Sequence, residues 1–350
     1  MRVIGASARA GDAVATFRVL DPAHRLTGVR LRPDVRVAGD LDFRRSGDAW
    51  ELAIDRPPVS RMEYLLELRH PDGGTQTVPD PGNPRQVAGA FGAKSVLEFP
   101  SYAPPGWLTA PAGPGRSQAF DVPAPALDGA IPVRTWSPAD APDDEPLPLL
   151  LVHDGPEYDA LASLTRYLSA GVAGAWLPRL RAALLGPGPR DSWYSANGRY
   201  ARALRLAVIP ALASRLASTI RVGMGTSLGG LAMLHAHRRY PDAFDALFLQ
   251  SGSFFTDRFD RHERRFGYYQ RIASFVAGVH QGRLPARPVP VILTCGAIEE
   301  NAGNNRLMTR DLLRQGYPAT LHEVADLHNY TAWRDAFDPH LTRLLRQLCP

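Results

Sequence analysis

The sequence predicts a two-domain chain of the α/β class, in which a small β-sandwich precedes a mostly parallel sheet covered by helices. Residues from about 12 to 98 alternate apolar and polar side chains, as half-buried strands do. Residues 101–117 are rich in proline and glycine, which disfavour both helices and central strands. From residue 118 onward, short apolar runs alternate with helical segments. We therefore expect domains over 1–100 and 118–350, joined by a linker over 101–117.

Strands of the first domain are indicated by period-two patterns. Trp50, Leu52 and Ile54 alternate with less apolar neighbours, and residues 63–69 repeat this pattern around Tyr64 and Leu66. Such alternation predicts strands with one buried face. The glycine-rich stretch HPDGGTQTV, residues 70–78, predicts a hairpin turn after the second of these strands.

The second domain is predicted from the alternation of its apolar runs with helical segments. Strands are expected at PLPLLLV (146–152), IRVGMG (220–225), ALFLQ (246–250), PVPVILTCG (288–296) and TLHEV (320–324). Helices are expected over about 158–184, 195–216 and 301–315, with a further helix directly after Ser227. This order places helices on both faces of a parallel sheet.

Composition excludes several classes of protein. The hydrophobic share of 45% and charged share of 21% are those of a soluble globular protein, and no apolar run is long enough to span a membrane. The net charge of +5 comes from arginine, Lys94 being the single lysine, and without basic runs interleaved with aromatic residues it does not predict nucleic-acid binding. No secretory signal is visible, so we expect a cytoplasmic protein of unassigned oligomeric state.

Metal and organic cofactors are not expected. Two cysteines, Cys295 and Cys349, form neither a disulfide framework nor a zinc-ligand set. His235 and His237 are two residues apart on a predicted helix, so they face different directions and cannot bind one metal ion together.

Ser227 is the candidate nucleophile. It lies in GTSLG between a predicted strand and a predicted helix, at the carboxyl end of the strand, where α/β proteins place their binding chemistry. Gly225 and Gly229 allow a sharp turn and a close approach of helix to strand. A structural turn is the alternative interpretation.

A serine hydroxyl needs a base, and the base needs an orienting acid. His328 follows the last predicted strand and is the candidate base. Glu299 is the first carboxylate after the strand at 288–296 and is our first choice of acid. Glu300, Asp326 and an arrangement without an acid remain alternatives. The order serine, acid, histidine is the one that this class of sheet requires.

Two backbone amides are candidates for stabilising an oxyanion. Leu228 would begin the helix after the nucleophile, and Gly155 lies in the HDGPEY loop after the first strand of the second domain. Pro156 has no N–H and cannot serve.

The chain resembles the enterochelin esterase family, in the esterase D-like branch of the α/β-hydrolase superfamily. The resemblance covers nearly the whole chain and rests on motifs that are specific in combination: VPDPGNP with FGAKS, LLLVHDGPEY, RDSWYSAN, GTSLGG with YPDAFDALFLQSGSF, CGAIEENAGNNRLM and LHNYTAWRDAF.

This resemblance implies an immunoglobulin-like domain before an α/β-hydrolase domain, and ester hydrolysis with Ser227, His328 and Glu299 in the catalytic roles. It also implies that Arg190, Asp154 and Trp333, which lie in the shared motifs, face the substrate. Relatives cleave the lactone backbone of catecholate siderophores, so the implied partner is a small-molecule ester, in one form an anionic ferric siderophore.

Some positions depart from the family pattern. The family often has Asp where Asn329 follows the histidine, many members have Asp at position 299, and Ser192 and Ala207 replace usual glutamates. Two alternative functions therefore stay open: an acyltransferase like the mycolyltransferases, and a non-catalytic binding protein on a hydrolase scaffold.

Overall fold

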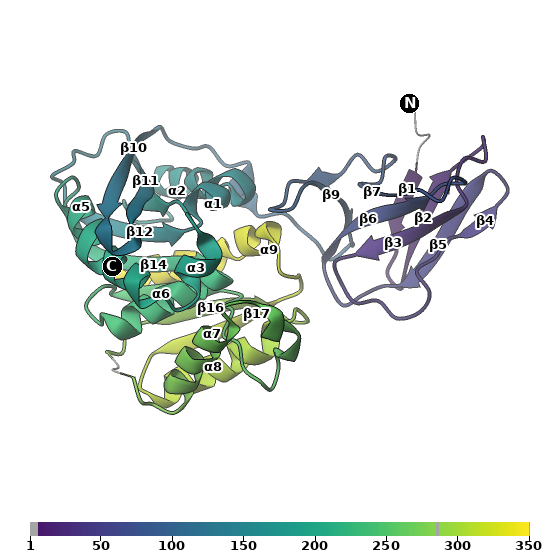
Figure 1. Cartoon of the computed structure of the whole chain (residues 1–350). Coiled ribbons are helices and arrows are strands. Elements are labelled where there is room, and N and C mark those ends of the chain that lie inside the picture. The colour runs from purple at the N-terminus through teal and green to yellow at the C-terminus, as the bar shows by residue number, and fades with distance from the viewer. Residues whose placement is uncertain (1–5, 285–286, 350) are drawn as a thin grey trace. The chain divides into compact units, whose positions relative to one another are not determined.

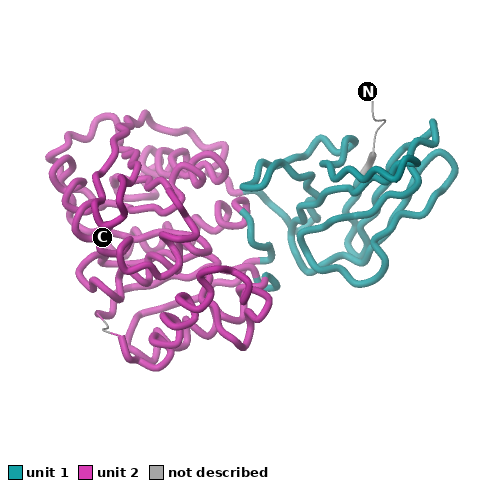
Figure 2. The backbone as a smooth tube through the Cα atoms, viewed as in Figure 1, with its two compact units in different colours: residues 1–104, 297–299, 325–329 teal, residues 105–296, 300–324, 330–350 magenta. Residues whose placement is uncertain are grey.

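The chain divides into two units (Figure 2). One comprises residues 1–104 together with 297–299 and 325–329, and the other comprises 105–296, 300–324 and 330–350. The structure is a computed structural model that describes residues 6–284 and 287–349. Residues 1–5, 285–286 and 350, which the predicted domains include, lie outside the described residues.

The first unit is built from two antiparallel sheets around one apolar core. The sheet orders are β1-β2-β5-β4 and β3-β6-β9-β8, with β7 also pairing with β6. Phe17 of one sheet meets Tyr64 of the other edge to face, with ring centroids 5.2 Å apart. The strands are β1 (Ala6–Ala10), β2 (Val14–Leu20), β3 (Gly28–Pro33), β4 (Arg44–Ser46), β5 (Ala49–Asp55), β6 (Arg61–Arg69), β7 (Thr75–Val78), β8 (Gln86–Val87) and β9 (Lys94–Glu98). The predicted hairpin turn joins β6 to β7.

Strand β6 departs from the predicted pattern of one buried face. Tyr64 and Leu66 are buried as expected, but Arg61, Glu63 and Glu67 on the opposite face are buried too. These charged side chains are tolerated because each forms an ion pair: Arg61 with Glu63, and Glu67 with arginines of the same sheet. Period-two alternation alone does not distinguish a solvated face from one covered by charge pairs.

Asp34 accepts a hydrogen bond from the N–H of Glu63 in this strand, and we expect its carboxyl group to make the stability of the chain depend on pH. Burial, together with repulsion from Glu63, raises the pKa of the Asp34 carboxyl to about 7. The folded chain therefore binds this proton more tightly than the unfolded chain, and the resulting stabilisation is complete below pH 3.8 and lost as the pH rises to 7. Asp34→Asn keeps an oxygen for the N–H of Glu63 and cannot ionise. We expect it to stabilise the chain at pH 8, by up to about 4 kcal/mol, and much less at pH 5.

Urea unfolding at the two pH values measures this effect, with Asp12→Asn as the control because the Asp12 side chain is exposed. Equal effects of Asp34→Asn at pH 5 and pH 8 would show that this carboxyl does not titrate between them.

A mixed eight-stranded sheet forms the centre of the second unit, in the order β10-β11-β13-β12-β14-β15-β16-β17 (Figure 1). Strands β13, β12, β14, β15, β16 and β17 are parallel, and β10 and β11 are antiparallel at one edge. The strands are β10 (Gly115–Ala124), β11 (Gly129–Pro138), β12 (Leu147–His153), β13 (Arg181–Leu185), β14 (Ser218–Thr226), β15 (Ala246–Gln250), β16 (Val291–Gly296) and β17 (Ala319–Val324).

Helices cover both faces of this sheet. In β12, Leu149 and Leu151 enter one apolar core, while Leu150 and Val152 enter the other, so the strand is buried on both sides. The α-helices are α1 (Gly155–Ala162), α2 (Leu164–Ala173), α3 (Arg190–Tyr194), α4 (Gly198–Ala203), α5 (Ile209–Ala213), α6 (Leu228–Arg239), α7 (Tyr269–His280), α8 (Ala302–Arg314), α9 (Tyr330–Asp335) and α10 (Thr342–Leu348). Shorter 3-10 or π segments are η1 (Gly106–Leu108), η2 (Pro125–Leu127), η3 (Leu204–Val208), η4 (Arg261–Arg265) and η5 (Phe337–Leu341). Among the described residues, no helix is both long and apolar enough to cross a membrane.

One sequence prediction for this unit is wrong in detail, and the stretch predicted to be a linker contains secondary structure. The helix predicted over 158–184 ends at Ala173, and its last residues belong to β13, because a short apolar run buried on both faces has no period that separates strand from helix. The linker predicted over 101–117 contains η1 and the start of β10 at Gly115, which pairs with Pro138. The prolines of this stretch, Pro104, Pro105, Pro111 and Pro114, all precede β10, so only the last three residues of the stretch belong to a strand.

Candidate active site

Ser227 occupies the turn between β14 and α6. Its backbone has φ 54° and ψ −124°, a conformation that favours glycine. The turn is fixed by its N–H, which donates to the carbonyl of Gln250 at 2.9 Å, and by its carbonyl, which accepts from the N–H of Leu231 at 3.1 Å. A non-glycine residue held in a strained turn at the end of a parallel strand is typical of a functional position.

The strain at this position predicts that two substitutions, which both remove the hydroxyl, differ in their effect on the free energy of unfolding. Ser227→Gly removes both the Oγ and the Cβ, and Ser227→Ala removes only the Oγ. Relief of about 1–3 kcal/mol of strain exceeds the entropic cost of the glycine, so we expect the glycine variant to unfold with a free energy about 1 kcal/mol higher than the alanine variant. Denaturant unfolding of the two proteins measures this difference. An alanine variant at least as stable as the glycine variant would mean that the turn stores no strain.

A cavity of about 160 Å³ opens beside Ser227. The hydroxyl of Ser253 lies 3.1 Å from the Ser227 Oγ, and the Ser253 N–H donates to the carbonyl of Ser227. The lining combines hydroxyl, aromatic and charged side chains: Arg190, Ser227, Leu228, Ser253, Phe255, Glu263, Phe266, Glu300 and Asn301. Sequence reasoning did not predict Ser253, Phe255, Glu263 or Phe266 as parts of the site.

Arg190 reaches the cavity from α3, and Asp154 holds its guanidinium. The Nε and Nη2 atoms donate to the two carboxylate oxygens of Asp154 at 2.9 and 2.8 Å. Asp154 is 1% exposed and has a left-handed backbone conformation. This paired, forked geometry fixes the direction of the arginine. Of the three side chains expected at the substrate, Arg190 lines the cavity and Asp154 holds the Arg190 guanidinium.

Trp333 lies in an apolar core cluster. It is buried in the core on one face of the sheet, and its indole N–H donates to the hydroxyl of Ser251 at 2.9 Å. It is not among the residues that line the cavity beside Ser227. The sequence motif that contains Trp333 did not reveal this orientation.

The two amides expected at an oxyanion both begin helices. Leu228 is the first residue of α6 and Gly155 the first of α1, so neither N–H has an acceptor within its own helix. A side chain at position 155 would overlap the backbone of Leu184 in β13, which explains the glycine. Leu228 lines the cavity beside Ser227.

His153 is a buried residue of the site region that the sequence analysis did not select. Its Nδ1 lies 2.9 Å from the carbonyl oxygen of Gly229 in α6, and because a carbonyl only accepts, Nδ1 carries the proton. Burial, with a smaller contribution from Arg190, lowers the pKa of His153 to about 4. A neutral His153 therefore ties the end of β12 to the first turn of α6 at physiological pH.

Glu299 and His328 belong to the first unit and lie next to each other. The Nδ1 of His328 is 3.3 Å from the Oε1 of Glu299, whose side chain is buried. The neighbouring candidate acids are placed differently. Asp326 forms an ion pair with Arg61, and Glu300, which belongs to the second unit, lines the cavity at Ser227.

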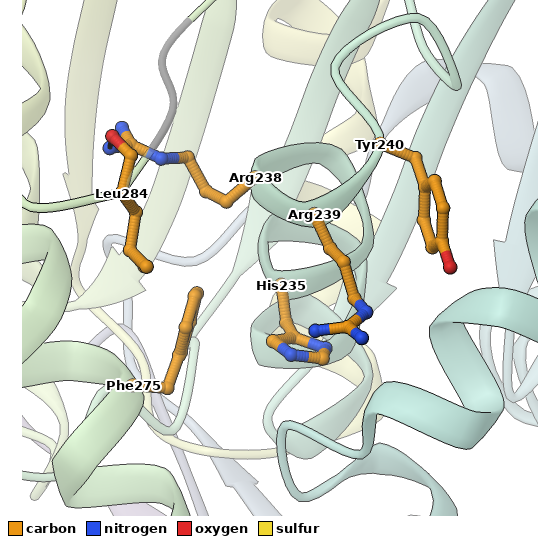
Figure 3. A pocket seen from close by; sticks show the side chains of 6 residues that line it. All are labelled: His235, Arg238, Arg239, Tyr240, Phe275 and Leu284. Atoms are coloured by element: carbon orange, nitrogen blue, oxygen red, sulfur yellow. Dashed lines mark hydrogen bonds between the residues drawn. The ribbon is translucent and has the colours of Figure 1, made fainter.

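A second cavity, of about 350 Å³, lies at the far end of α6 (Figure 3). It is lined by His235, Arg238, Arg239, Tyr240, Phe275 and Leu284. His235 packs against Phe275, whereas His237 approaches Tyr317 and the carbonyl of Arg287, so the two histidines face different neighbours. Within residues 6–284 and 287–349, no group of three or more His, Cys, Asp or Glu side chains is arranged to hold a metal ion.

The fold is that of the enterobactin esterases over nearly the whole chain. A scan against protein-family models gives no match, and neither does a search of curated protein sequences. Comparison with solved structures gives strong matches, so the resemblance to the enterochelin esterases seen in the sequence is confirmed at the level of the fold.

Several of the matching structures are esterases. An enterobactin esterase from Shigella flexneri, solved in the presence of enterobactin, is 19% identical with a TM-score of 0.78, covering 98% of this chain and 96% of that one. A ferric enterobactin esterase from Salmonella typhimurium has the same identity and TM-score, with coverage of 98% and 97%. A ferulic acid esterase is 14% identical with a TM-score of 0.56 and covers 66% of this chain and 98% of its own.

Proposed function

We propose that this chain is a serine carboxylesterase of the α/β-hydrolase class, with Ser227 as nucleophile, His328 as general base and Glu299 as the acid that orients the histidine. The observation that carries the proposal is the strained turn that presents Ser227 to a cavity at the carboxyl end of β14. The shared fold of structures named as esterases supports the same reaction class.

Strand topology supports the choice of base and acid. Strands β14, β15, β16 and β17 are parallel neighbours, so their carboxyl ends meet at one edge of the sheet. Ser227 directly follows β14, Glu299 follows β16 by three residues, and His328 follows β17 by four. The contact between Glu299 and the Nδ1 of His328 leaves Nε2 as the nitrogen that accepts a proton.

The reaction would proceed through an acyl-enzyme. Nε2 of His328 takes the proton of Ser227 as Oγ attacks the ester carbonyl, and the N–H groups of Leu228 and Gly155 stabilise the oxyanion. The imidazolium, stabilised by Glu299, returns the proton to the leaving alcohol. A water molecule, deprotonated by the same histidine, then releases the acid and restores Ser227.

The substrate we propose first is a catecholate trilactone of the enterobactin type. The cavity at Ser227 is smaller than the roughly 300–1,000 Å³ of typical ligand sites, so within the second unit it would hold only the group next to the scissile ester. Phe255 and Phe266 suit an aromatic ring there, which also favours simpler aryl esters such as feruloyl esters as a second candidate. Its charged lining, one arginine with Glu263 and Glu300, does not by itself favour a strongly anionic complex.

Product analysis distinguishes these substrates. Cyclic and linear catecholate trilactones, each with and without iron, are incubated with the chain beside feruloyl and acetyl sugar esters, and with Ser227→Ala as the control. We expect hydrolysis of the iron-free trilactones by the unaltered chain alone. Hydrolysis of feruloyl esters only would reassign the substrate, and no hydrolysis of any ester would leave a non-catalytic binding protein.

We propose that the first unit is an immunoglobulin-like domain. Its two antiparallel sheets and single shared core are the features that support this assignment.

A further inference from the structure

A buried ionic cluster of the first unit surrounds Arg61, the first residue of β6. The Arg61 side chain is 1% exposed. Its Nη2 donates to Glu63 Oε1 at 2.8 Å, and its Nη1 donates to Asp326 Oδ2 at 3.1 Å and to Asn329 Oδ1 at 3.0 Å. Two of its three partners therefore belong to the segment 325–329, more than 260 residues away in the chain.

The segment 325–329 has further contacts with the β sheets. The N–H of Ser60 donates to the carbonyl of Ala325 at 2.7 Å, and Leu327 is buried in the apolar core of the first unit. Within the segment, Asp326 Oδ1 accepts from the N–H of Leu327 and from the side-chain amide of Asn329. Every residue flanking His328 is thus fixed, either by Arg61 or by the core.

Stability alone does not explain such a cluster. Burial lowers the pKa of Arg61, and attraction by Asp326 and Glu63 outweighs this to raise it, while burial raises the pKa of Asp326. Burial therefore works against the charged form of both partners, and buried ion pairs of this kind are often replaceable by apolar residues without loss of stability. An apolar side chain could not donate directional hydrogen bonds to two side chains at once, as the planar guanidinium of Arg61 does.

We propose that Arg61 is a positioning residue that holds the 325–329 segment so that His328 keeps one orientation. This inference rests on the proposed function, in which His328 is the base. It gives the β domain a defined part in catalysis: its β6 strand supplies the anchor for the residues on both sides of the imidazole. Asn329, a departure from the family pattern, takes part as an acceptor for the Arg61 guanidinium.

The test compares three variants of the full chain. Arg61→Met removes the hold on Asp326 and Asn329. Arg61→Lys restores a charge without the fork, and Glu63→Gln, the matched control, alters the Arg61 partner that lies outside the segment. We expect Arg61→Met to lower kcat for an aryl ester by about a hundredfold with KM within about twofold, because a misplacement of about 1 Å has an effect of that size. Arg61→Lys should recover part of kcat, and Glu63→Gln should change it less than about threefold.

Hydrogen exchange of the peptide that contains residues 325–329 gives a readout that does not depend on activity. We expect faster exchange in Arg61→Met than in Glu63→Gln. Wild-type exchange or wild-type kcat in folded Arg61→Met would overturn the proposal. If Arg61→Met does not fold, Asn329→Ala, which removes one contact, must show the same two effects in weaker form or the proposal fails. A wild-type chain without esterase activity would refute the proposed function, while exchange would still decide whether Arg61 fixes the segment.

Discussion

Ser227→Ala is expected to lower kcat for ester hydrolysis by about 10⁴-fold or more. The alanine variant keeps the turn between β14 and α6 and the cavity lining but has no oxygen to form the acyl-enzyme. Losses of this order follow when a catalytic nucleophile is removed, and the activity that remains comes from the other groups of the site. Initial rates with an aryl ester, at saturating and at low concentration, measure kcat and kcat/KM.

Ser253→Ala is the matched control, because it removes a hydroxyl only 3.1 Å from the Ser227 Oγ. We expect it to lower kcat by no more than about tenfold, since Ser253 can adjust the nucleophile by hydrogen bonding but does not attack the ester. If the effects of the two substitutions were reversed, the nucleophile would be Ser253 and the strained turn would serve only to position it.

Gly225→Ala is expected to disrupt the same turn, because the added Cβ would overlap the backbone of α6. A Cβ at position 225 would lie 2.5 Å from the carbonyl carbon and oxygen of Gly229 and 2.9 Å from the backbone N of Gly230. Because these are backbone atoms of α6, no side-chain rotation relieves the overlap and the helix must move from the strand. We expect a loss of about 3 kcal/mol or more and a fall in Tm of about 6–12 °C, together with loss of activity.

Gly267→Ala controls for the substitution itself, since nothing lies within 4 Å of the added carbon. Thermal unfolding and aryl ester hydrolysis are measured on both variants. A Gly225→Ala protein with the stability and activity of the Gly267→Ala protein would mean that strand and helix do not approach as closely as the structure has them.

The fold of the second unit could be predicted because its parallel strands are short apolar runs separated by helical segments. The prediction failed where that signal is ambiguous. Residues 181–185, Arg-Ala-Ala-Leu-Leu, are buried on both faces and have no period that separates strand from helix, so the helix predicted over 158–184 extended into them. In the first unit, Arg61 of β6 pairs with its neighbour Glu63 but also with Asp326, which is distant in the chain, and no local pattern reveals the second partner.

The candidate site also contains some residues that the sequence reveals and others that only the structure reveals. The turn at Ser227 was predictable because its parts are local: strand, glycines and helix are contiguous in the sequence. Ser253, Phe255, Glu263 and Phe266 come from the irregular stretch between β15 and α7, and only the three-dimensional structure brings them to the cavity. The burial of Trp333 in the apolar core on one face of the sheet was likewise not apparent from its motif.

Labelling with a serine-directed fluorophosphonate tests most directly whether Ser227 is activated by His328. Intact mass and peptide mapping are recorded for the unaltered chain and for His328→Ala. We expect one adduct per chain, on Ser227, formed at least about a hundredfold more slowly in His328→Ala because the hydroxyl has lost its base. An adduct on another residue, or labelling of Ser227 at the same rate without the imidazole, would contradict the assignment of the pair.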